Sequence, residues 1–192
     1  MSQIDIGAVE QAVLCVYNQT IDVGTRQDAQ RFLDQFKSTE HSWKRACDMF
    51  AASFHAEVKF WCLQVLQELL QYRYLLLSPE DSFHLREVLS SWLVEQSTAR
   101  SPPPPFILNK LAQLYAIMAG HEYPERWESP VTALLARLQA EPSLGLVMAF
   151  IRVLEALDDE VISRDVARAP AQAGASMRVK DALREQCMPA VA

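Results

Sequence analysis

The side chains best suited to catalysis or metal binding are scattered along this sequence. Its four histidines fall in separate segments, and no two have the H-x-x-x-H spacing that brings two imidazoles to one metal ion. The motifs G-x-S-x-G, G-x-G-x-x-G and G-x-x-x-x-G-K-S/T are absent, and five glycines in 192 residues leave little room for a phosphate-cradling loop. The histidines are His41, His55, His84 and His121. We therefore expect no enzyme activity, no metal site and no cofactor.

Polar side chains repeated at helical spacing are better candidates for contacts with another protein. Two predicted helices carry such a stripe at i, i+4 and i+8: Glu40, Lys44 and Asp48 within residues 40–53, and Glu87, Ser91 and Glu95 within residues 80–96. If these helices face a partner, their carboxylates would attract basic side chains, and such complementarity mainly raises the encounter rate. A solvated helix face is the alternative explanation.

The densest acidic run, Asp158-Asp159-Glu160, is a further candidate for binding. Arg164 follows Glu160 by four residues, so the two side chains would pair along one helix face. That pairing is an ordinary structural role, and it is the alternative to a role of the run in binding.

Tyr72-Arg73-Tyr74 interleaves two aromatic rings with a cation. This composition is typical of proteins that stack on nucleic-acid bases, which makes Arg73 and Tyr74 candidates for RNA contact. The end of an amphipathic helix explains the same three residues.

Composition indicates a folded chain that does not bind nucleic acid on its own. Half of the residues are apolar and 22% are charged, which argues against disorder. The formal net charge is −6, whereas a protein that neutralises phosphates needs clustered Lys and Arg. The N-terminus has acidic Asp5 where a secretory signal needs positive charge, so we expect a cytosolic or nuclear protein without a membrane anchor. The four cysteines have no C-x-x-C pair and are expected to be reduced core thiols: Cys15, Cys47, Cys62 and Cys187.

Apolar periodicity predicts an all-α solenoid built from antiparallel helix pairs. The segment Val58–Tyr74 has two apolar stripes and is expected to be packed on more than one side, as is the helix that begins at Ser143. The predicted pairs span about 25–54, 56–97, 105–140 and 143–188, intervals typical of helical-hairpin repeats. A surface loop is expected at Ala167–Ala175, with Ser176 capping the last helix. That helix lacks a polar outer cap, so we expect one array at the front of a longer chain.

Proline and serine mark several of the boundaries between these helices. Ser78-Pro79 and Ser129-Pro130 each suit a helix start, because Ser can cap and Pro fits the first helical position. Ser101 precedes four consecutive prolines, Pro102–Pro105, which must be extended or polyproline-like. A stiff loop is one interpretation of this run, and a polyproline ligand for another protein is the other.

Four strings of the sequence, in this order, resemble the N-terminal region of exportin-T, the transfer-RNA exportin family of the importin-β superfamily. They are VKFWCLQVLQELLQYRY, FILNKLAQLYAIMAGHEYPERW, VLEALDDEVISRDV and KDALREQCMPAV. With the segments between them they cover about Thr25 to Val191. The most specific part is Arg184-Glu185-Gln186-Cys187 following the acidic run.

The resemblance implies a right-handed superhelix of HEAT repeats whose second helices line the concave side. It further implies a receptor that binds Ran-GTP and transfer RNA in the nucleus, passes the pore through contacts with nuclear pore proteins, and shuttles between nucleus and cytoplasm. The N-terminal repeats would hold Ran and contribute to RNA binding. On this basis we assign to Ran the residues Glu40, Lys44, Asp48, Glu87, Ser91, Glu95, Asp158 and Asp159, and to RNA Arg73 and Tyr74. A general helical-repeat scaffold for a protein or peptide partner is the alternative.

Overall fold

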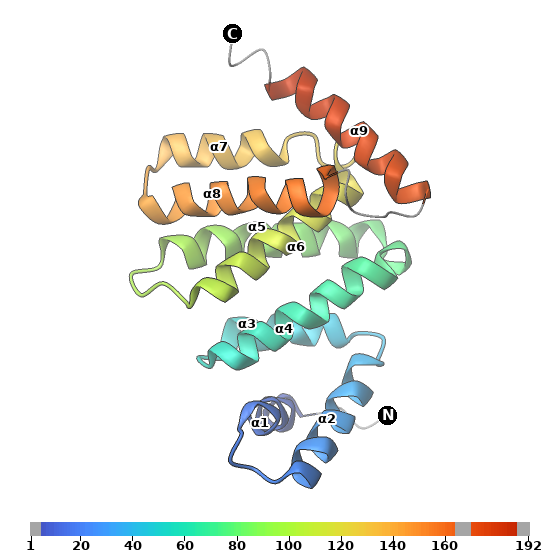
Figure 1. Cartoon of the computed structure of the whole chain (residues 1–192), viewed down its shortest axis with the longest axis vertical. Helices are drawn as coiled ribbons and strands as arrows, with labels where there is room; N and C mark the ends of the chain where they lie inside the picture. The colour runs from blue at the N-terminus through green and yellow to red at the C-terminus, as the bar shows by residue number, and fades with distance from the viewer. Residues whose placement is uncertain (1–4, 164–169, 188–192) are drawn as a thin grey trace. The chain divides into compact units, whose positions relative to one another are not determined.

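The chain folds into two compact units, Met1–Leu76 and Leu77–Ala192. This computed structural model describes residues 5–163 and 170–187 (Figure 1). Throughout those residues the regular elements are helices, with no β-strand among them. The predicted all-α class is therefore confirmed.

The described part of the first unit contains four α-helices and two short turns of other helix types. The α-helices are α1 (Ile6–Tyr17), α2 (Val23–Lys37), α3 (Ser42–Ala52) and α4 (Ala56–Glu68). A π-helical turn, Leu69–Arg73, and a 3-10 turn, Tyr74–Leu76, extend α4. α1 packs mainly on α2, α3 packs mainly on α4, and α1 also contacts α4.

The end of α2 is fixed against α4 by an aromatic contact and an ion pair. The buried rings of Phe36 and Trp61 lie with their centroids 5.7 Å apart. Lys37 Nζ is 2.6 Å from Glu68 Oε1 and 5.9 Å from the centroid of the Trp61 ring. Because Lys37 is the last residue of α2, these contacts combine apolar burial with a charge placed favourably at a helix C-terminus.

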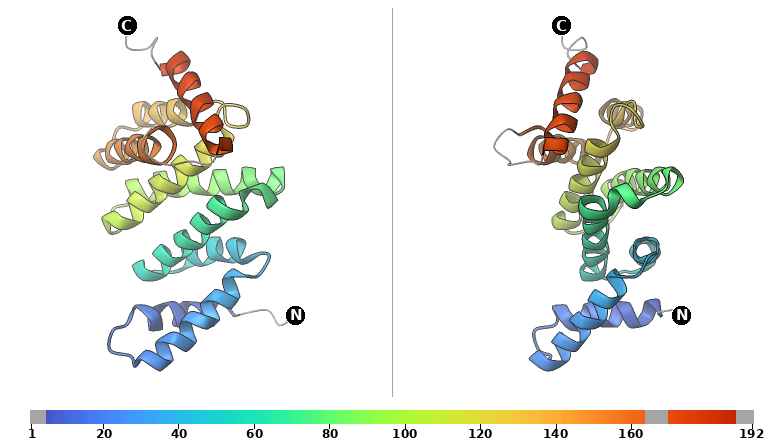
Figure 2. Two further views of the ribbon diagram at one scale, coloured as in Figure 1. Left: turned by 45° about the vertical axis from the view of Figure 1, so that its right-hand side comes forward. Right: turned by 90° about the vertical axis from the view of Figure 1, so that its right-hand side faces the viewer.

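The second unit contains the remaining described helices. They are α5 (Pro79–Thr98), α6 (Pro105–Glu122), α7 (Pro130–Ala140), α8 (Leu144–Leu157) and α9 (Pro170–Cys187), with a π-helical turn, Asp158–Ile162, directly after α8. Figure 2 shows α5 and α7 on one side of this unit and α6 and α8 on the other. α6 packs between α5 and α8 and also contacts the π turn and α9.

α6 is the central helix of the second unit and is buried around most of its circumference. Its buried apolar residues are Ile107, Leu108, Leu111, Ala112, Leu114, Tyr115, Ala116, Ile117, Met118 and Ala119. For α8 the sequence predicts burial on two sides, and this prediction is wrong. α8 buries one face through Leu146, Ala149, Val153 and Leu157. Five of its other apolar side chains are each more than a third exposed: Leu144, Val147, Met148, Ile151 and Leu154.

The loop between α6 and α7, residues 123–129, is held in place by side chains of α5, α6 and α9. Arg86 of α5 donates to the Arg126 carbonyl at 2.7 Å, and its Nη1 is 3.1 Å from Glu122 Oε2. The Tyr115 hydroxyl donates to the Pro130 carbonyl at 2.8 Å. Arg178 of α9 pairs with Glu125 at 3.2 Å. The loop is therefore an integral part of the unit's packing.

The observed helix pairs begin one helix earlier along the chain than the expected pairs. We expected 25–54 to be a pair, but α2 contacts α3 less than it contacts α1, and α3 packs mainly on α4. In the second unit α5 packs on α6, and α7 has more contact with α8 than with α6. Loops are short on both sides of each helix, so loop length does not reveal where a pair begins. The second helices of the observed pairs are α2, α4, α6 and α8.

Sequence signals located most helix starts, with three local differences. Ser78 and Ser143 cap α5 and α8 through their hydroxyls, as expected, whereas Ser129 makes no capping hydrogen bond. α2 is capped by Asp22, three residues before residue 25, where the first pair was expected to begin. α9 begins at Pro170, inside the predicted loop, and residues 164–169 lie outside the described part. Ser176 is therefore inside a helix, where its hydroxyl donates to the Val161 carbonyl.

Cys47 and Cys62 are buried, and burial determines how readily their thiols ionise. Burial raises the pKa of Cys47 to about 12, with a contribution from the Asp48 charge, and burial also raises the pKa of Cys62. At pH 8 roughly one Cys47 thiol in 10⁴ is then ionised. Cys15 is half-buried, and the Cys187 side chain lies outside the described residues.

We expect Cys47 and Cys62 to react with iodoacetamide at pH 8 at least 100-fold more slowly in the native chain than in urea, as followed by peptide mass mapping. The raised pKa also means that the unfolded thiols ionise above about pH 8.5 while the folded ones stay protonated, so the free energy of unfolding should fall as pH rises through that value. Equal rates in native buffer and in urea would contradict the burial of these thiols.

Candidate protein-binding surface

The first predicted stripe lies on α3 and is exposed. Glu40, which precedes the helix, and Lys44 and Asp48 within it all point to solvent. The Lys44 ammonium also lies 5.2 Å from the centroid of the neighbouring Trp43 ring. The three residues thus share a face, but that face belongs to the first helix of a pair.

The second predicted stripe lies on α5, which is also the first helix of its pair. Glu87, Ser91 and Glu95 are exposed. All three have local partners, because the Ser91 hydroxyl donates to Glu95 Oε1 at 2.6 Å and Glu87 Oε1 lies 3.4 Å from Arg86 Nε. If the inner surface lies on second helices, as the resemblance implies, these two stripes lie outside it. Contact through either stripe stays a prediction.

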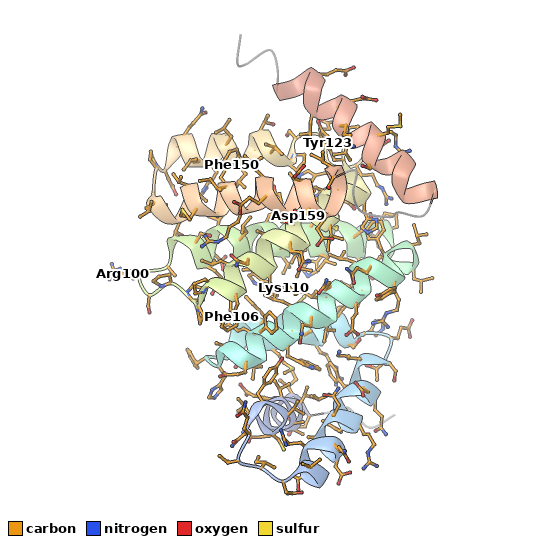
Figure 3. The ribbon with its side chains drawn as sticks, in the orientation of Figure 1. Arg100, Phe106, Lys110, Tyr123, Phe150 and Asp159 are labelled. Carbon is orange, nitrogen blue, oxygen red and sulfur yellow. The ribbon has the colours of Figure 1, made fainter. Side chains whose placement is uncertain are left out.

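The acidic run lies on the π turn that follows α8, a second helix. Asp158 and Asp159 are exposed, and Figure 3 shows Asp159 on this turn and Lys110 on the neighbouring α6. Glu160 is half-buried and accepts a hydrogen bond of 2.5 Å from Gln113 Nε2. The predicted partner of Glu160, Arg164, lies outside the described residues. Asp158 and Asp159 are therefore presented outward while Glu160 has a structural contact.

Gln113 links Glu160 to a cation on α6. Lys110 Nζ donates to Gln113 Oε1 at 2.9 Å, so a relay of three side chains joins α6 to the π turn. Partial burial lowers the pKa of Lys110, and the negative charge of Glu160 acts in the opposite direction. Eight residues before Glu160, Arg152 of α8 donates to Asn109 of α6 at 2.7 Å. These cross-links hold the end of α8 in a defined position against α6.

Glu155 is a further exposed carboxylate on the same face, and the sequence reasoning did not include it. Its spacing of three and four residues to Asp158 and Asp159 is the signal that could have found it. We define the acidic end of α8 as Glu155, Asp158 and Asp159. The C-terminus of a helix is itself negative, so the three carboxylates add to an existing field that attracts cations.

The predicted RNA contacts lie at the end of α4, where the structure gives them other surroundings. Tyr74 is only 5% exposed, so its ring is not presented for stacking on a base. Arg73 is half-buried and its Nη2 lies 3.4 Å from the Lys37 carbonyl at the end of α2. Tyr72, which was not assigned to RNA contact, is 79% exposed. Of the two assigned residues, Arg73 keeps part of its surface in solvent.

Two other features, a metal site and a membrane-spanning helix, have no candidate within the described ranges. Among residues 5–163 and 170–187, no three His, Cys, Asp or Glu side chains gather in a group that could hold a metal ion. In the same ranges, no helix is both long enough and apolar enough to cross a membrane.

Comparison with known proteins shows which proteins this chain resembles. The family model described as exportin 1-like protein matches residues 104–192. Exportin-T of Danio rerio is 34% identical over 184 residues, which covers 95% of this chain and 19% of the relative. Exportin-T of Arabidopsis thaliana is 32% identical over 191 residues, covering 96% and 19%. The chain is therefore similar to exportin-T over almost its whole length. Exportin-T of Oryza sativa subsp. japonica is 42% identical over 142 residues, covering 74% and 14%.

This similarity to exportin-T confirms the resemblance found in the four strings. It also places the observed helix pairs in a HEAT-type helical-repeat fold. The chain spans about a fifth of the length of the exportin-T relatives it matches. The exportin 1-like region begins one residue before α6, so it covers α6 and the helices that follow.

Proposed function

We propose that this chain is part of a nuclear export receptor that binds Ran-GTP and carries transfer RNA between nucleus and cytoplasm. The observation that carries the proposal is similarity to exportin-T along almost the whole chain, in both an animal and a plant relative. The helical-repeat fold agrees with it, because such folds offer long surfaces to protein partners. Passage through the pore would require contacts with nuclear pore proteins. The chain acts by binding, and we propose no reaction for it.

The acidic end of α8 is the part of this chain that we propose for contact with Ran. Glu155, Asp158 and Asp159 are exposed, lie at the negative end of a helix, and belong to a second helix of a pair. The hydrogen bonds from Gln113 of α6 to Glu160 of the π turn and from Arg152 of α8 to Asn109 of α6 keep this end rigid, which lowers the entropy lost on binding. The α3 and α5 stripes are secondary candidates.

The contribution of this chain to RNA binding is proposed to be small. Its net charge is −6, and neutralising phosphates requires several basic side chains on one surface. Arg73 remains the candidate residue, since part of its side chain is in solvent. Most of the grip on transfer RNA is therefore assigned to parts of the full-length protein outside these 192 residues.

Charge reversal tests the proposed Ran contact. We expect Asp158→Lys with Asp159→Lys to weaken binding of the chain to Ran loaded with a non-hydrolysable GTP analogue about tenfold, or about 1.4 kcal/mol. The loss should appear mainly in the association rate and grow at low salt, because the two carboxylates are exposed. Binding kinetics at two salt concentrations measure it.

The matched control carries the same change in net charge on α3. Glu40→Lys with Asp48→Lys alters two exposed carboxylates of the α3 stripe, so it reproduces any effect of long-range charge alone. We expect it to weaken binding less than threefold. If both variants lose affinity equally, the acidic end of α8 has no specific role, and if the α3 variant loses more, the contact lies on the first helices.

A general helical-repeat scaffold is the second candidate, and the exposed apolar face of α8 favours it. Leu144, Met148 and Ile151 recur at the i, i+4, i+7 spacing by which a groove or helix face meets an amphipathic helix. A scaffold of this kind would bind its partner irrespective of the nucleotide on Ran. Dependence on the nucleotide therefore separates the two candidates.

A further inference from the structure

Three serines of this chain are followed directly by proline: Ser78, Ser101 and Ser129. Proline-directed protein kinases bind a serine in an extended segment and read the proline that follows it. The dipeptide alone does not distinguish the three positions. Their surroundings do, because a kinase needs an accessible hydroxyl, an accessible proline and non-helical backbone around both.

The serine at the start of α5 does not meet these conditions. Ser78 is the N-cap of α5, and its Oγ accepts a hydrogen bond of 3.0 Å from the Asp81 backbone N–H. Pro79 is already the first residue of the helix, so the segment after the serine is helical. Phosphorylation at Ser78 would require the first turn of α5 to unwind.

The serine at the start of α7 is excluded by burial. Ser129 is half-buried and the proline that follows it, Pro130, is buried. The Pro130 carbonyl also accepts the hydrogen bond from the Tyr115 hydroxyl. A kinase could reach this proline only if the loop between α6 and α7 left the unit.

The third serine has the geometry that a kinase requires. Ser101 and Pro102 are both exposed in the loop between α5 and α6, residues 99–104. The ends of this loop have extended backbone, with φ −60° and ψ 138° at Ala99 and φ −52° and ψ 144° at Pro104. Figure 3 shows Arg100 at the outer tip of the loop, pointing away from the helices. The consecutive prolines hold the segment extended, so little chain entropy is lost when it binds.

We propose that Ser101 is a phosphorylation site for a proline-directed protein kinase. The Ser101 Oγ attacks the γ-phosphorus of Mg²⁺-bound ATP, the bond from that phosphorus to the bridging oxygen breaks, and ADP leaves. The hydroxyl proton passes to the catalytic aspartate of the kinase. The phosphoserine adds a charge of about −1.5 to −2 beside Arg100, in a loop that can take it without repacking.

The test compares the folded chain with short peptides of the same sequence. The 192-residue chain and three peptides covering residues 73–83, 96–106 and 124–134 are incubated with a cyclin-dependent kinase and Mg²⁺-ATP, and phosphorylation sites and initial rates are measured by mass spectrometry. We expect the native chain to gain one phosphate, on Ser101. Ser101→Ala or Pro102→Ala should lower the initial rate at least tenfold, and Ser129→Ala should leave it unchanged.

The peptides show whether the fold makes the selection. If the Ser78 and Ser129 peptides are phosphorylated while the same serines in the native chain are not, the structural argument holds. Comparable phosphorylation of Ser78 or Ser129 in the native chain would overturn the proposal. So would a native chain whose Ser101 stays unmodified, whether or not the 96–106 peptide reacts.

Discussion

Replacing Arg86 by Ala should lower the free energy of unfolding by about 3–5 kcal/mol, the range found when one partner of a buried ion pair is removed. The side chain of Glu122 is 1% exposed and that of Arg86 is 12% exposed, so the variant deprives a buried carboxylate of the Arg86 charge. Arg86 also lies over two rings, with its guanidinium carbon 4.7 Å from the Phe83 centroid and 5.6 Å from the Trp127 centroid. These contacts are lost together with the hydrogen bond to the Arg126 carbonyl.

Urea denaturation followed by circular dichroism measures this loss, with two variants for comparison. Arg137→Ala removes an exposed pair, in which Arg137 lies 3.2 Å from Glu141, and should cost about 0.5 kcal/mol or less. Arg86→Met combined with Glu122→Leu replaces both charges by apolar groups and should recover much of the stability. The packing of Arg86 is misassigned if Arg86→Ala costs no more than Arg137→Ala.

Gly145→Ala should be at least as damaging, at about 3 kcal/mol or more. A Cβ atom at this position would lie 1.9 Å from the Ser97 carbonyl oxygen and 3.0 Å from its carbon. Both are backbone atoms near the end of α5, so no side-chain rotation relieves the clash. Accommodating the methyl group requires the start of α8 to move away from α5, which disturbs the burial of the α8 face that packs in this unit.

Gly174→Ala is the matched control for this substitution. Gly174 lies in α9, and the nearest atom to its added Cβ is Arg178 Nη1 at 3.8 Å, an ordinary contact distance. Alanine is the better helix former, so this variant should gain roughly 0.5–1 kcal/mol. Thermal unfolding of the two variants gives the comparison, and a Gly145→Ala chain within 1 kcal/mol of the parent would show that the approach of α8 to α5 is looser than described.

The sequence was sufficient for the fold class and for several helix starts, because those depend on local rules. Ser78 and Ser143 each accept a hydrogen bond from the backbone N–H three residues on, as their local sequence indicates. The pairing of helices depends on long-range packing instead. Residues 38–41 and 53–55 are both short enough to join antiparallel neighbours, so the loops could not show that α3 packs mainly on α4.

The ends of α4 and α8, near the candidate sites, were harder to predict. Each is followed by a π-helical turn, which departs from the α-helical period of 3.6 residues. A π turn holds one residue more than an α turn, so it shifts the faces of the residues that follow. After Leu69–Arg73 this shift is accompanied by burial of Tyr74 and exposure of Tyr72. A constant period of 3.6 residues could not show which of the two rings would be available.

The acidic end of α8 was found only in part, and the reason is an incorrect expectation about burial. Asp158 and Asp159 stand out as a run, whereas Glu155 lies within a strongly apolar segment that was expected to be packed on two sides. α8 has a single buried face, so Glu155 reaches solvent next to the run. Its exposure depends on how many neighbours α8 has, which is a property of the packed unit.

Selective retention of Ran by the immobilised 192-residue chain is the most direct measurement of the proposed function. Ran is loaded with GTP in one sample and with GDP in the other, and circular dichroism establishes that the chain is helical under the same conditions. We predict that the GTP-loaded form is retained with at least tenfold higher affinity. Equal retention of the two forms by a folded chain, or retention of neither, would contradict a Ran-binding role for these residues.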